Sequence, residues 1–98
     1  MYKIIDGRGT GKTTRLITLA KETEATIVAR DPSYVRYKAE RLGIFGVEVL
    51  SYEEFLFLRS QKPEKQFLID EIQTLANYLT SKTGGRLLGY TFSDNDIE

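Results

Sequence analysis

The sequence contains no cysteine and no histidine among its 98 residues. Without cysteine there is no disulfide, no thiolate zinc site and no cysteine nucleophile. Without histidine there is no Ser-His-Asp triad, no imidazole metal ligand and no histidine general base. Any chemistry must therefore come from carboxylates, lysine and arginine side chains, hydroxyls and backbone amides.

Long hydrophobic runs are also lacking. No stretch approaches the roughly 18 apolar residues of a membrane span, and residues 1–6 lack the basic region and apolar core of a signal peptide. These patterns predict a soluble, cytoplasmic protein with no membrane partner. The net charge is zero, so the whole chain has no general attraction to nucleic acid. The charge is uneven, however: residues 1–41 carry 9 basic and 5 acidic side chains, and residues 42–98 carry 5 and 9.

Short β-rich segments alternate with helical segments along the chain. Strands are expected at 2–5, 26–29, 47–50, 66–70 and 86–92, and helices at 13–23, 32–42, 52–59 and 72–81. This alternation predicts an α/β fold with a mainly parallel five-stranded sheet and helices on both faces. One domain is expected over residues 1–93, followed by an acidic, frayed tail over 94–98. Ligands of such sheets bind beyond the carboxyl ends of the strands.

A glycine-rich segment follows the first expected strand and leads into a helix. It comprises Gly7, Arg8, Gly9, Thr10, Gly11, Lys12, Thr13 and Thr14. Glycines let successive amides point inward, and a helix N-terminus favours an anion. A lysine reaches the outer phosphates and a hydroxyl binds Mg²⁺. The segment therefore predicts a phosphate-binding loop of the Walker A type.

Two departures limit which nucleotide motif the loop matches. Asp6 stands where the Walker A pattern has its first glycine, so a basic, glycine-rich hairpin without nucleotide is the alternative interpretation. A dinucleotide fingerprint does not fit, because Thr14 occupies the position of its third glycine.

Two adjacent carboxylates, Asp70 and Glu71, follow the apolar run at 67–69. In a Walker B arrangement, Asp70 binds Mg²⁺ and Glu71 activates the attacking water. Adjacent residues at a strand end point to different sides, so the two carboxylates can address the metal and the γ-phosphate separately. The alternative is structural: Asp70 caps the following helix and Glu71 favours its first turn.

These motifs resemble those of P-loop NTPases with a glutamate beside the Walker B aspartate. The motif order is similar to the first lobe of DEAD/DEAH-type helicases and to phage terminase-like ATPases. The resemblance implies a minimal RecA-like core, ATP and Mg²⁺ as ligands, and host cytoplasm as the compartment if a phage encodes the chain. It further implies sensor roles for Gln73 and for Thr91 or Ser93 at the end of the fifth strand. Arg8, Arg30, Arg41 and Arg86 are the candidates for an arginine supplied in trans.

The functional expectation is an Mg-ATP-binding protein, a slow or partner-activated ATPase in phage DNA replication, recombination or packaging. Lys12 and Glu71 are its expected catalytic residues, and a homo-oligomer or another protein is expected to supply the trans arginine. Two alternatives stay open: a non-catalytic accessory module, and a small nucleotide or nucleoside kinase. A nucleic-acid partner is a further alternative, because residues 33–41 place tyrosines and basic side chains on one helix.

Overall fold

The computed structural model describes residue 4 and residues 11–58 and 65–91. Their elements are α1 (Lys12–Thr23), β1 (Thr26–Ala29), α2 (Pro32–Arg41), β2 (Val49–Ser51), α3 (Tyr52–Leu56), β3 (Phe67–Ile69) and α4 (Ile72–Ser81). The strands form one sheet in the order β2-β1-β3, and both pairings are parallel. Ile27 is in register with Val49 on one side and with Leu68 on the other.

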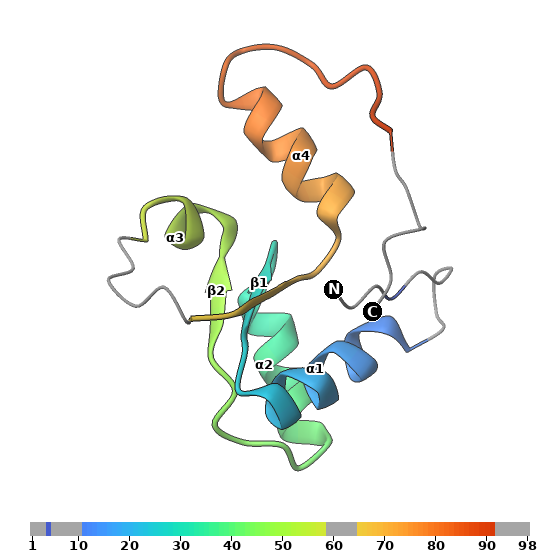
Figure 1. The fold of residues 1–98 in the computed structure, drawn as a ribbon, viewed down its shortest axis with the longest axis vertical. Coiled ribbons are helices and arrows are strands. Elements are labelled where there is room, and N and C mark those ends of the chain that lie inside the picture. The colour runs from blue at the N-terminus through green and yellow to red at the C-terminus, as the bar shows by residue number, and fades with distance from the viewer. Residues whose placement is uncertain (1–3, 5–10, 59–64, 92–98) are drawn as a thin grey trace.

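Helices cover both faces of this sheet, as Figure 1 shows, with α1 and α2 on one side and α3 and α4 on the other. The alternation along β1 explains the two layers, because successive side chains of a strand point to opposite faces. Ile27 and Ala29 pack with apolar side chains of α1 and α2. Val28, between them, packs with Tyr52 of α3 and Leu75 of α4.

Local signals in the sequence explain where α2 and α3 begin and end. The Asp31 carboxylate accepts a hydrogen bond from the Tyr34 amide, and proline occupies the first helical position. Gly43, with a φ of 72°, follows the end of α2 in the left-handed conformation that glycine tolerates best. Ser51 and Glu54 form the capping box that starts α3.

The prediction of five strands is wrong for the described chain, which forms three. The first expected strand, 2–5, lies outside the described residues apart from Ile4. Residues 86–91 of the fifth expected strand are irregular and run beyond α4, away from the sheet (Figure 1). A strand needs a partner, and here Leu88 is fully exposed while the Tyr90 hydroxyl donates to Gln73 on α4.

No helix in the described part of the chain has the length and apolar character needed to cross a membrane. The extent of the single expected domain, 1–93, and of the acidic tail stays a prediction, because residues 92–98 lie outside the described ranges.

Candidate functional site

The carboxyl edge of the sheet gathers the end of every strand, because all pairings are parallel. Arg30 follows β1, Ser51 ends β2, and Asp70 follows β3. The amide of Asp70 donates to the carbonyl of Val28 at 2.8 Å, which fixes the end of β3 beside β1. This edge is where ligands of parallel α/β sheets bind.

The first turn of α1 contacts this edge of the sheet, because Lys12 forms an ion pair with Glu71. The Lys12 ammonium lies 3.1 Å from the Glu71 carboxylate, across 59 positions of sequence. Gly11 caps α1 with a φ of 81°, and no side chain of the described residues caps the helix. The pair therefore joins the start of α1, at the end of the glycine-rich segment, to the acidic pair.

The start of α4 differs in detail from the alternative interpretation, in which Asp70 caps the helix. Glu71, not Asp70, is the N-cap residue of α4, and no side chain makes a capping hydrogen bond there. The Glu71 backbone is left-handed, with φ 59° and ψ 70°, which is disfavoured for a residue with a Cβ atom. The Glu71 carboxylate pairs with Lys12 and makes no hydrogen bond to the first turn of α4.

Burial and then the neighbouring charge of Glu71 raise the pKa of Asp70, and Lys12 opposes the shift. A raised folded-state pKa means that the group stabilises the fold below its unfolded pKa and loses that contribution as pH rises. At neutral pH the ionised Asp70 therefore lowers the free energy of unfolding. A half-buried carboxylate held at such a cost is typical of functional sites.

Tyr52 is a site residue that the motifs do not indicate. Its hydroxyl lies 2.9 Å from the Asp70 carbonyl oxygen and 3.1 Å from that of Glu71, and donates its hydrogen bond to this pair of acceptors. Burial first, and then the charges of Asp70 and Glu71, raise the pKa of this phenol to about 12. The sequence signals only the capping box around Tyr52, because a contact between α3 and the β3–α4 turn depends on tertiary packing.

The other predicted residues are only partly described. Gly7, Arg8, Gly9, Thr10 and Ser93 lie outside the described residues. Thr13 and Thr14 are half-buried in the first turn of α1, beside Lys12. The Gln73 side chain accepts from Tyr90, and Thr91 is exposed in the irregular segment, so the strand expected to carry it to the site is absent from the described chain.

The residues of this edge can coordinate Mg²⁺ only if a bound phosphate supplies further oxygen ligands. No group of three or more acidic side chains gathers within the described ranges as a metal cage. Mg²⁺ typically binds one or two carboxylates together with substrate phosphates and waters. Asp70 is a carboxylate at this edge that fits the pattern, and Thr13 carries a hydroxyl next to Lys12, whose ammonium contacts Glu71.

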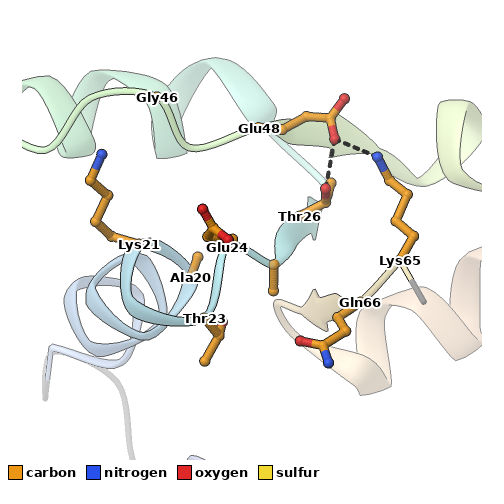
Figure 2. Close-up of a pocket in the computed structure, with 10 residues that line it drawn as sticks. Ala20, Lys21, Thr23, Glu24, Thr26, Gly46, Glu48, Lys65 and Gln66 are labelled. Carbon is orange, nitrogen blue, oxygen red and sulfur yellow. Dashed lines mark hydrogen bonds and ion pairs between the residues drawn. The ribbon is translucent and has the colours of Figure 1, made fainter.

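A concave site of about 590 Å³ lies at the amino end of the strands, opposite the carboxyl edge. Figure 2 shows its charged lining, which includes Lys21, Glu24, Glu48 and Lys65. Glu48 accepts from the Thr26 hydroxyl at 2.6 Å and from Lys65 at 2.9 Å, which lowers the pKa of Glu48. Lys21 donates to the Phe45 carbonyl. Glu48 and Lys65 are thus paired with each other, and the Lys21 ammonium is held by a backbone carbonyl.

No protein-family model, no curated protein and no solved structure matches the chain.

Proposed function

We propose that the chain binds Mg-ATP at the carboxyl edge of its sheet. The observation that carries the proposal is the Lys12–Glu71 ion pair, which brings the two nucleotide-type motifs into contact from 59 positions apart. The Glu71 carboxylate makes no capping hydrogen bond to α4, so it is available to the site together with Lys12. The proposal follows the resemblance to P-loop NTPases.

The chemistry assigns one role to each side chain. Lys12 would leave Glu71 and neutralise charge on the β- and γ-phosphates, and the amides of residues 7–13 would hold the β-phosphate. Thr13 and Asp70 would hold Mg²⁺, which would neutralise phosphate charge. Glu71, released from Lys12, orients the attacking water or accepts its proton. Phosphoryl transfer of this kind depends on positioning and electrostatic stabilisation.

Hydrolysis by the chain alone is slow in this proposal. An arginine supplied in trans accelerates related reactions by about 10³–10⁵. Arg30, Arg41 and Arg86 are exposed, and Arg30 directly follows β1 at the same edge as the acidic pair. A second copy or another protein supplies the arginine, and phage DNA replication, recombination or packaging is the proposed setting.

Calorimetric titration with ATP, with and without Mg²⁺, tests this proposal. We expect saturable binding that is at least about tenfold tighter with Mg²⁺, because Asp70 acts only through the metal. Replacing Glu71 by glutamine should leave this binding in place and lower the slow turnover by about 10²-fold or more, the usual contribution of a general base. Absence of binding to the wild-type protein would overturn the proposal.

The same measurements decide between the alternatives. A non-catalytic accessory module binds Mg-ATP, or nothing, and Glu71→Gln changes no turnover. A small nucleotide or nucleoside kinase consumes ATP only when an acceptor nucleoside or nucleotide is added. An ATPase releases phosphate without an acceptor.

Single-stranded nucleic acid is a second proposed ligand, on the exposed face of α2. Tyr34 and Tyr37 are about half exposed there. The Lys38 ammonium lies 5.9 Å from the Tyr34 ring centre, and the Arg41 guanidinium lies 5.8 Å from that of Tyr37. Alternating cations and aromatic rings suit phosphates and stacked bases. The positive charge of the first 41 residues supports the same ligand.

Replacing both Tyr34 and Tyr37 by alanine should weaken binding of a fluorescent single-stranded oligonucleotide by about tenfold or more, since stacking contributes about 1–3 kcal/mol per base. Binding to the wild-type protein should weaken as salt rises. Tyr90→Ala is the matched control, because Tyr90 is equally exposed but lies beyond α4. The proposal that α2 binds single-stranded nucleic acid would be contradicted by binding that does not depend on salt. Equal losses of oligonucleotide affinity in the two variants would contradict it as well.

A further inference from the structure

The turn between β3 and α4 holds a conformation that its sequence does not favour. Glu71 is left-handed, and glutamate has no special tolerance for this region. Such a backbone persists only where its surroundings hold it in place. The contacts around Asp70 and Glu71 therefore show what maintains the acidic pair.

Two of these contacts belong to the adjoining secondary structure. The Asp70 amide donates to the carbonyl of Val28 at the end of β1, and the Leu75 amide donates to the carbonyl of Glu71 in the first turn of α4. Each bond fixes one side of the turn. Neither of them spans it.

The Tyr52 hydroxyl spans the turn, since it lies within 3.1 Å of both the Asp70 and the Glu71 carbonyl oxygens. Successive carbonyls alternate in extended backbone and point the same way in helical backbone of either hand. Because the Glu71 backbone is helical in type and not extended, the two consecutive carbonyls can share one hydroxyl. The hydroxyl and the unusual backbone therefore fit each other.

Tyr52 is itself firmly held. It begins α3 immediately after the capping box of Ser51 and is only 3% exposed. Its ring lies 5.7 Å from that of Tyr78 and packs in the same cluster as Val28 and Leu75. This packing holds the Tyr52 hydroxyl in one position. If the β3–α4 turn moved, its two carbonyls would therefore lose their hydrogen bond to the hydroxyl.

We propose that Tyr52 is a positioning residue, whose hydroxyl fixes the turn from which Asp70 and Glu71 project into the site. The inference rests on the proposed nucleotide site and adds to it a residue outside both motifs. Tyr52 touches no reacting atom. It acts through Asp70, by holding this carboxylate where Mg²⁺ needs it.

Replacing Tyr52 by phenylalanine keeps the packed ring and removes only the hydroxyl. We expect the gain in ATP affinity that Mg²⁺ provides to fall by about tenfold, the lower end of the loss seen when a residue that orients a metal ligand is changed. ATP affinity without Mg²⁺ should stay within about twofold, because it depends on the amides of residues 7–13 and on Lys12. Titrations of both proteins with and without Mg²⁺ give the two values.

Tyr78→Phe is the matched control, since it removes a hydroxyl from the neighbouring ring and leaves the turn unchanged. It should alter neither affinity by more than about twofold. The inference would be overturned if Tyr52→Phe lowered ATP affinity equally with and without Mg²⁺, or did not lower it at all. A Tyr52→Phe protein that fails to fold while Tyr78→Phe folds would overturn it as well, because a positioning hydroxyl leaves packing intact.

Amide hydrogen exchange separates this inference from the proposed function. Without any nucleotide, Tyr52→Phe should speed exchange of the Leu75 amide by about tenfold and leave the amides of α1 unchanged. If the wild-type protein binds no ATP, the proposed function fails, and this local effect still decides whether Tyr52 holds the turn. Unchanged exchange at Leu75 would show that it does not.

Discussion

Replacing Lys12 by alanine is expected to weaken Mg-ATP binding by at least about 100-fold, which corresponds to about 2.7 kcal/mol. A single hydrogen bond to a charged group contributes about 1.5–3 kcal/mol. The variant also leaves Asp70 and Glu71 without their nearby positive charge, so the edge repels phosphate. Calorimetry or displacement of a fluorescent ATP analogue measures the change.

The fold should survive the Lys12 substitution, because Lys12 and Glu71 are 26% and 52% exposed and such ion pairs contribute about 0–1 kcal/mol. A loss of binding without a loss of stability would thus place the effect at the site. Lys38→Ala is the matched control: it removes the same charge from α2, remote from Glu71. A Lys12→Ala protein that binds Mg-ATP within about threefold of wild type would contradict the proposed site.

Replacing Ile27 by alanine is expected to lower the free energy of unfolding by about 2–5 kcal/mol. Ile27 is fully buried in β1, the central strand, and packs against α1 and α2. The shorter side chain leaves a cavity that two helices and two neighbouring strands cannot fill. Urea denaturation followed by circular dichroism measures the difference. A domain of this size has only about 5–15 kcal/mol in total, so this loss is a large fraction of its stability.

Ile72→Ala provides the matched comparison, because it removes the same atoms from a side chain that is 52% exposed. It should change the free energy of unfolding by less than about 0.5 kcal/mol. Equal effects of the two substitutions would show that β1 is not the centre of the core.

The secondary structure was largely predictable, since its determinants are local. The periodicity of α4 predicts Ile72–Ser81, and Asp31 with Pro32 predicts the start of α2, as the structure confirms. Local patterns predict a strand at 86–92 that the described residues do not form. Whether such a strand forms depends on a partner strand, which local sequence does not show. An apolar pattern alone could not show that Leu88 is exposed and that Tyr90 contacts Gln73.

The candidate site was predictable in outline and not in detail. The motifs predict that Lys12 and Glu71 belong to one site, and the structure shows an ion pair between them. The left-handed backbone of Glu71 has no counterpart in the sequence, since glutamate does not favour it. The contact of Tyr52 arises from packing between α3 and α4, which no local pattern encodes. Nucleotide binding itself stays a prediction.

The 59 positions that separate Lys12 from Glu71 mean that the unfolded chain contains no version of the site. A ligand of this site therefore binds the native state alone, and its binding energy adds to the stability of the fold. At 100 times its dissociation constant, such a ligand stabilises the native state by about 2.7 kcal/mol. That gain is comparable to the expected loss from Ile27→Ala, so a saturating nucleotide should restore much of the stability that this core variant lacks.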